Sequence, residues 1–217
     1  MTRLTTRDIL AAGLDDWHKL AQALHARYRI PDFAAGAAFV AAVAEAAEAA
    51  GHHPDLRLTY GVVDVSSCTH DEGYAVTEKD VALAHTVSRL AREHGLEPEP
   101  AAVTQIELAL DTADRDRLGP FWSVLLTGEP GNVTHDSVFD PTGRVPVLWF
   151  QDTDAHPTPR QRWHIDLWLA PEVAEERIRA AVEAGGVVVD ASEAPSFTVL
   201  ADPDGNKACV CTALDRS

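Results

Sequence analysis

Basic residues are scarce in this sequence. Its 18 lysines and arginines stand against 34 aspartates and glutamates, so the formal net charge is −16 at pH 7. A surface of that sign repels a phosphate backbone. We therefore expect no nucleic-acid partner.

Cysteines and long apolar runs are also few. The three cysteines, Cys68, Cys209 and Cys211, cannot all pair and form no CxxC motif, so we expect reduced thiols in a reducing compartment. The longest apolar stretch, AAGAAFVAAVAEAAEAA, is interrupted by Glu45 and Glu48, whereas a membrane span needs roughly 18–20 apolar residues. The opening MTRLTTRDIL lacks the basic-then-apolar order of a secretory signal. These absences predict a cytoplasmic protein without a membrane partner.

The length of 217 residues suffices for two domains that each bury a core. The segment EHGLEPEPAAV, residues 93–103, carries a glycine, two prolines and three acids, which is typical of a linker. We expect an N-terminal domain over residues 1–97, a linker over 98–102 and a C-terminal domain over 103–217.

Cap residues mark the elements of the N-terminal half. Asp32 precedes an alanine-rich helix, whose apolar residues at helical spacing are Phe33, Ala37, Val40, Ala44 and Ala47. Gly51 followed by Pro54 ends that helix. LDDWHKLAQALHARYRI, residues 14–30, reads as a short helical turn running into a strand.

Two further signals organise residues 56–90. Apolar parity changes between Leu56-x-Leu58 and Val63-x-Val65, which predicts a tight reversal at residues 60–62. Thr77 and Asp80 have the spacing of a capping box and begin a second helix.

Three histidines border this reversal: His52 and His53 follow the first helix, and His70 follows the second strand. They could be surface or capping residues, a zinc site or an acid–base site. Adjacent histidines seldom bind one ion together, and no nearby cysteine or carboxylate completes a ligand pattern. Imidazoles titrate near neutral pH, so a cluster can hold one ring as acid and another as base. The spacing favours proton transfer, as in a dehydration.

The pattern Glu48-xxx-His52-His53-Pro54, Tyr60, Thr69-His70-Asp71 and Asp80 resembles the signature of the pterin-4a-carbinolamine dehydratases, over roughly residues 4–94. The resemblance implies an α+β fold, an antiparallel sheet packed on helices, and a pterin substrate. It also implies loss of water from 4a-hydroxytetrahydrobiopterin to give quinonoid dihydrobiopterin, without a metal or organic cofactor.

By the same resemblance, His52, His53 and His70 form the pterin pocket and supply acid and base. Glu48 and Asp80 are supporting polar groups, although Asp80 could only close the capping box and Glu48 could be solvated helix surface. The sequence departs from the family at Leu56, where an aromatic is usual, and in the longer loop DEGYAVT after His70. These departures put the substrate preference in doubt.

The second half contains an internal repeat. IELAL at 106–110 matches IDLWL at 165–169, 59 residues later, and each copy precedes a helical stretch and short strands. Gly119-Pro120 should shorten or kink the first of these helices. The repeat, RWHIDLWL and DPDGNKACV resemble the vicinal-oxygen-chelate (glyoxalase and bleomycin-resistance) superfamily, which implies paired βαβββ modules around a pocket.

Metal ligands of that superfamily fall here on Gln105, His164 and Cys209, with Trp149 or Gln151 near the remaining position. An amide, an imidazole and a thiol do not make the oxygen- and imidazole-rich site of such enzymes. We therefore expect no catalytic metal. His164 and Cys209 would instead be pocket and core residues, and the domain would bind a small organic ligand or stabilise the oligomer. Trp122, Trp149, Trp163 and Trp168 could line that pocket or pack in the core.

The sequence therefore predicts a pterin dehydratase domain fused to a glyoxalase-like domain. A non-catalytic binding or assembly protein, or an enzyme whose main activity lies in the C-terminal domain, remains an alternative. The resemblance to the carbinolamine dehydratases also implies a homo-oligomer, either a dimer or a tetramer.

Overall fold

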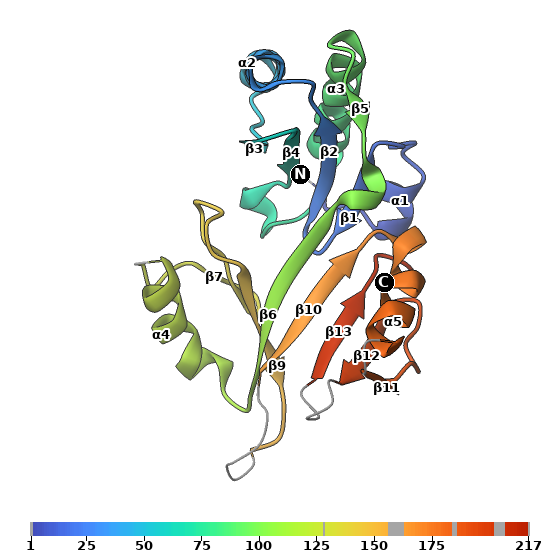
Figure 1. Ribbon diagram of the computed structural model, residues 1–217. Coiled ribbons are helices and arrows are strands. Elements are labelled where there is room, and N and C mark those ends of the chain that lie inside the picture. The colour runs from blue at the N-terminus through green and yellow to red at the C-terminus, as the bar shows by residue number, and fades with distance from the viewer. Residues whose placement is uncertain (1, 128, 156–162, 184–185, 202–206, 217) are drawn as a thin grey trace. The chain divides into compact units, whose positions relative to one another are not determined.

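The computed structural model describes residues 2–127, 129–155, 163–183, 186–201 and 207–216. It contains two compact units, residues 1–104 with 213–217 and residues 105–212. The N-terminal unit packs helices on an antiparallel sheet, and the C-terminal unit has a mixed sheet with helices (Figure 1). The predicted α+β class is confirmed.

The N-terminal unit is built around a sheet in the order β1-β2-β4-β3, with β5 also paired to β2. The elements are α1 (Thr6–Leu10), β1 (Trp17–Leu20), β2 (Ala23–Arg29), α2 (Phe33–Ala50), β3 (Asp55–Thr59), β4 (Val62–Ser67), the 3₁₀ turn η1 (His70–Glu72), α3 (Glu78–Glu93), β5 (Glu97–Pro98) and the 3₁₀ turn η2 (Pro100–Ala102).

Local signals set the ends of these elements as the sequence predicts. The Asp32 carboxylate accepts a hydrogen bond from the Ala35 amide at 2.8 Å, and Gly51 closes α2 in the left-handed conformation. The reversal lies at residues 60–61, where β3 turns into β4. The turn expected at the start of residues 14–30 is short, with the Trp17 amide donating to the Leu14 carbonyl at 3.0 Å, and the strand expected after it is a hairpin of β1 and β2.

The buried face of α2 differs from the stripe that the spacing suggested. Gly36, Phe39, Val43 and Ala47 are buried, whereas Phe33 is 59% exposed. Alanines occur on every side of this helix, so apolar character alone does not select a buried face. The larger side chains of Phe39 and Val43 decide which face packs. They join side chains of β2, β4 and α3 in the core.

By length and hydropathy alone, α2 could cross a membrane, since its mean hydropathy is 1.5 over 18 residues. Capping at both ends and the packing of its large side chains are also what a core helix shows.

The segment expected to be a linker takes regular structure. Pro98 and Glu97 pair with Tyr28 and Arg29 of β2, and the Glu99 amide donates to the Arg27 carbonyl at 2.8 Å. Residues 97–99 therefore extend the N-terminal sheet.

His25 of β2 is a half-buried histidine of this sheet, opposite His18 of β1 and Ser66 of β4. Burial lowers its pKa to about 4, although Asp64 and the Leu20 backbone oppose the shift. The unfolded ring, with a pKa of about 6.5, binds a proton first as pH falls. The contribution of the neutral His25 ring to stability is thus complete above about pH 6.5 and is lost as the pH falls towards 4.

We expect the thermal unfolding midpoint of the N-terminal unit to decrease as the pH is lowered from about 6.5 to about 4. His25→Gln should flatten this part of the profile in calorimetry of the full chain. The control His85→Gln, on the exposed face of α3, should keep the wild-type slope. An unchanged slope in His25→Gln would contradict the assignment.

The C-terminal unit repeats one strand–helix–three-strand module. The first copy is β6 (Thr104–Thr112), α4 (Arg115–Thr127), β7 (Val133–Thr134), β8 (Ser137–Val138) and β9 (Val147–Asp152), and the second is β10 (Trp163–Leu169), α5 (Pro171–Glu183), β11 (Val187–Asp190), β12 (Phe197–Ala201) and β13 (Lys207–Cys211). The sheet order is β11-β12-β13-β10-β6-β9-β8-β7. In each copy the first and last strands pair in parallel. The predicted paired modules are confirmed.

Helix α4 runs through Pro120 instead of ending before it. Proline lacks the N–H that would bond the Asp116 carbonyl, four residues back in the first turn. Of the two effects expected of Gly119-Pro120, the shortening is wrong, and the kink stays a prediction.

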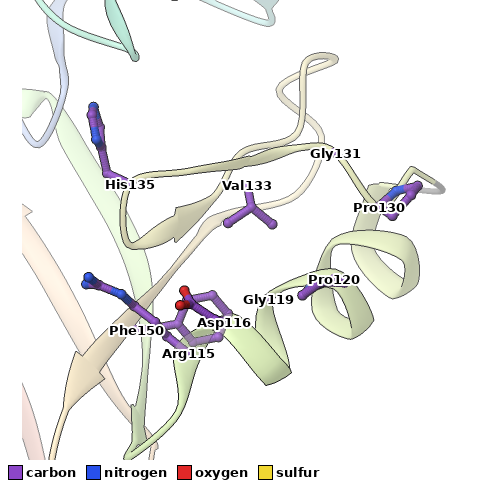
Figure 2. Close-up of a pocket in the computed structure, with 9 residues that line it drawn as sticks. All are labelled: Arg115, Asp116, Gly119, Pro120, Pro130, Gly131, Val133, His135 and Phe150. Carbon is purple, nitrogen blue, oxygen red and sulfur yellow. The ribbon is translucent and has the colours of Figure 1, made fainter.

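A cavity of about 290 Å³ lies beside α4 (Figure 2). Residues of α4, of β7 and its flanking loops, and of β9 line it: Arg115, Asp116, Gly119, Pro120, Pro130, Gly131, Val133, His135 and Phe150. The tryptophans that could have lined a pocket do not line this one. Trp149 and Trp168 instead donate hydrogen bonds to Asp166 and Glu107 at 2.8 and 2.7 Å.

Candidate functional site

The end of α2 positions the histidine pair. Gly51 has φ +57°, a left-handed conformation that glycine adopts without steric cost, and its amide donates to Glu48 and Ala47 carbonyls. The His52 amide also donates to the Ala47 carbonyl, at 3.2 Å. His52 is consequently turned inward, with 10% of its side chain exposed, while 61% of the His53 side chain is exposed.

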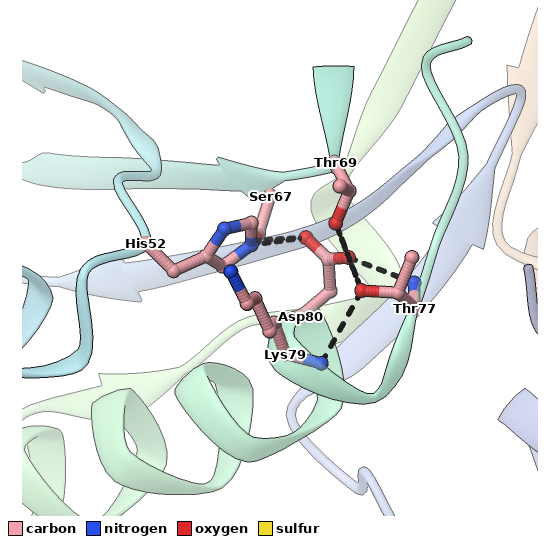
Figure 3. Close-up of polar contacts among 6 residues, drawn as sticks. All are labelled: His52, Ser67, Thr69, Thr77, Lys79 and Asp80. Atoms are coloured by element: carbon pink, nitrogen blue, oxygen red, sulfur yellow. Dashed lines mark hydrogen bonds and ion pairs between the residues drawn. The ribbon is translucent and has the colours of Figure 1, made fainter. Parts of the chain in front are cut away.

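Asp80 is the buried centre of the site, and none of its side chain is exposed (Figure 3). One carboxylate oxygen, Oδ1, accepts hydrogen bonds from Ser67 Oγ and His52 Nε2, both at 2.7 Å. The other, Oδ2, accepts from Thr69 Oγ1 and the Thr77 amide, both at 2.8 Å. Asp80 therefore closes the capping box of α3, as one expectation held, and it also contacts His52.

The charge on Asp80 decides the proton on His52. Burial opposes ionisation, but hydrogen bonds from Ser67, His52, Thr77 and Thr69 together hold the pKa of the carboxyl below its usual range. An ionised carboxylate has no proton to give, so Nε2 of His52 donates in their 2.7 Å hydrogen bond. In a neutral His52 ring, Nδ1 is then the nitrogen without a proton.

His53 and Glu48 form a second, exposed histidine–carboxylate pair. Nε2 of His53 lies 3.2 Å from Glu48 Oε1, and 80% of the glutamate side chain is exposed. Solvent weakens such a contact to well under about 1 kcal/mol. The pair is a loosely held version of the contact between His52 and Asp80.

His70 lies at the start of η1, directly after Thr69. Its ring stacks on Tyr74, with centroids 4.8 Å apart and 29° between the ring planes. Tyr74 belongs to the loop that departs from the family pattern, so that departure provides a ring contact for His70. Within residues 2–127, no hydrogen bond, ion pair or ring contact joins His70 to His52 or His53.

The expected site residues thus fall into linked groups. The structure joins His52 to Asp80 and His53 to Glu48, and it ties the residue before His70 to the Asp80 carboxylate. Sequence reasoning missed the role of Ser67 and gave none to Thr69. The signal available for both was a pair of small hydroxyl residues at the end of a buried strand, within SSCTH.

Two of the expected ligand positions of the C-terminal unit lie close together. His164 and Cys209 each have a donor atom within 4.8 Å of the others in a group with Asp166. The side-chain amide of Gln105 contacts the Ile106 carbonyl at 3.5 Å.

Comparisons with known proteins match two separate regions of the chain, one within each compact unit. A family model for pterin 4 alpha carbinolamine dehydratase matches residues 2–90, and one for a glyoxalase-like domain matches residues 107–211.

Several relatives provisionally named pterin-4-alpha-carbinolamine dehydratase are similar to the chain. The protein of Cyanothece sp. is 42% identical over 36% of this chain and 80% of its own length. That of Thermosynechococcus vestitus is 41% identical over 41% of this chain and 95% of its own. A solved Brucella melitensis protein, described as a transcriptional coactivator/pterin dehydratase, is 34% identical over 42% of this chain and 99% of its own, with a TM-score of 0.40.

Proposed function

Because the chain belongs to the pterin-4a-carbinolamine dehydratase family through its N-terminal domain, we propose that this domain removes water from a 4a-hydroxytetrahydropterin. One acid gives a proton to the 4a-hydroxyl, which leaves as water. One base takes the proton from ring N5, and the product is the quinonoid dihydropterin. Protons balance, and the reaction requires only acid–base groups.

The observation that carries this proposal is the buried contact between Asp80 and His52. A neutral His52 with its proton on Nε2 presents Nδ1 as a base. If that nitrogen accepts a proton, the resulting cation is in contact with a carboxylate 2.7 Å away. We assign His52 as the base for N5, with Asp80 as its positioning residue.

His53 and His70 are the exposed imidazoles beside this contact, and we assign the proton for the leaving hydroxyl to one of them. Both rings are accessible to a substrate. Glu48 can orient His53, and Tyr74 limits the orientation of His70 through ring stacking.

The test is an absorbance assay of 4a-hydroxytetrahydrobiopterin decay with the full chain. The decay with wild type should be faster than the spontaneous decay. At least one of the variants His53→Ala and His70→Ala should lower kcat by about 10²-fold, a typical contribution of one acid–base group. His85→Ala, an exposed histidine of α3, should match the wild type. Decay at the spontaneous rate with folded wild type would reject the proposal and favour the non-catalytic binding alternative.

We also propose that the chain forms a homo-oligomer, a dimer or tetramer, and that the C-terminal domain binds a small ligand. Light scattering tests the first. For the second, the cavity beside α4 offers Arg115, Asp116 and His135 as polar groups along an otherwise mostly apolar lining.

A further inference from the structure

The sheet of the C-terminal domain has one face that its helices do not cover. Leu167 and Leu169 of β10 and Val210 of β13 pack with residues of α5. Side chains alternate along a strand, so His164 and Asp166 of β10 and Cys209 of β13 lie on the opposite face. Three donor types, imidazole, carboxylate and thiol, therefore share this face.

Asp166 provides an unexplained oxygen there. The residue is only 6% exposed, and its Oδ2 accepts a hydrogen bond from Trp149 Nε1 at 2.8 Å. Its Oδ1 is buried and accepts no hydrogen bond from the residues that the structure describes. A buried carboxylate oxygen that accepts no hydrogen bond is costly, so its retention requires an explanation such as a bound ion.

The distance from this oxygen to His164 fits a shared ion better than a hydrogen bond. Nε2 of His164 lies 3.4 Å from Asp166 Oδ1. Hydrogen bonds between nitrogen and oxygen usually span about 2.7–3.2 Å, so this distance is too long for one. Two ligands each about 2.1 Å from an ion, at the tetrahedral angle, lie about 3.4 Å apart.

The surroundings of the two ligands also match a metal site. Nδ1 of His164 faces Asp111 Oδ1 at 3.8 Å, and metal-bound histidines commonly direct their second nitrogen to a carboxylate. Trp149 donates a hydrogen bond to the other Asp166 oxygen, and carboxylates that bind metals are commonly held by such donors.

Cys209 supplies the third donor. It lies opposite Asp166 in the parallel pairing of β10 and β13, and the three donor atoms lie within 4.8 Å of one another. Small side-chain adjustments would bring all three to bonding distance of one ion.

We propose that His164, Asp166 and Cys209 bind a divalent transition-metal ion of the zinc type. Nitrogen and sulfur ligands exclude magnesium and calcium, which take oxygen ligands. The ligand set is not the one that resemblance suggested, because Asp166 replaces Gln105. Three protein ligands leave a position for a substrate or water, and a bound ion would supply a Lewis acid there. This inference is independent of the dehydratase proposal.

The internal repeat provides a matched control. Glu107 stands 59 residues before Asp166, at the same place in the first module, and is also buried with a tryptophan donor, Trp168. Cys68 provides a control thiol in the N-terminal domain, where burial raises its pKa to about 12.

The experiment is equilibrium dialysis of chelator-treated full chain against Zn²⁺, with bound metal measured by mass spectrometry. Wild type should bind about one ion per chain. His164→Gln, Asp166→Asn and Cys209→Ser should each weaken binding at least about 10-fold, while Glu107→Gln and Cys68→Ser stay within about twofold. Co²⁺-loaded wild type should show thiolate-to-cobalt absorption that Cys209→Ser lacks, a readout independent of stability.

Three outcomes would overturn the inference. They are wild type binding less than about a tenth of an ion per chain, Mg²⁺ competing equally with Zn²⁺, or Glu107→Gln weakening Zn²⁺ binding as much as Asp166→Asn.

Discussion

Asp80→Asn is expected to lower kcat for pterin dehydration by about 10²- to 10⁴-fold. The new side chain keeps one oxygen, which can still accept from the Thr77 amide and Thr69. Its amide nitrogen then faces His52 and, as a donor, requires a bare Nε2. The His52 proton must move to Nδ1, so the ring loses the tautomer that serves as base; a comparable tautomer change in a serine protease costs about 10⁴.

The matched control is Glu48→Gln. It makes the same chemical change in the exposed contact to His53, where the 3.2 Å distance and solvent leave little energy to lose. We expect a change in kcat below about threefold. In Asp80→Asn, KM should stay within about threefold, because binding does not require the His52 tautomer. Equal losses in both variants would show that Asp80 does not act through His52.

Asp80→Ala is expected to lower the free energy of unfolding of the N-terminal domain by about 3–5 kcal/mol. The change removes the acceptor of several buried donors, and unpaired buried polar groups cost about 1–3 kcal/mol each when they cannot rearrange. The measurement is hydrogen exchange of the α3 and β4 amides in the full chain, which reports on this region directly.

Asp8→Ala is the control for helix capping. Asp8 closes the capping box of α1 with Thr5 as Asp80 does with Thr77, but at an exposed position. Its hydrogen bonds with Thr5 are exposed to solvent, which replaces them when they are lost, so Asp8→Ala should lower the free energy of unfolding much less than Asp80→Ala. An Asp80→Ala effect no larger than that of Asp8→Ala would reduce Asp80 to a cap.

The pH dependence of stability separates charge from shape. The folded pKa of Asp80 lies below the ordinary value of about 3.9, so its charge stabilises the fold above that pH. This contribution is lost as pH falls through the folded pKa. The stability difference between wild type and Asp80→Asn should therefore shrink below about pH 4.

Much of the fold followed from the sequence because its signals are local. Caps act over three residues, as Asp32 does with Ala35 and Thr77 with Asp80, and the parity change before Val63 reveals a reversal without knowledge of distant partners. The internal repeat likewise predicted both modules, since matching segments fold alike. The same signals named the histidines, because adjacent imidazoles before a proline are visible in the chain itself.

Tertiary structure alone decided what those residues touch. His52 and Asp80 are 28 residues apart, and Ser67 meets them only because β4, α2 and α3 pack into one core. The sequence did not show which face of α2 packs, because alanines occur on every side of the helix. The large side chain of Phe39, and not the spacing of apolar residues, decides that face. Asp166 looked like an ordinary strand carboxylate until its burial, with one oxygen accepting no hydrogen bond within the described part of the chain, set it apart. Hydrogen bonds between distant segments depend on burial and distance, which a linear sequence does not encode locally.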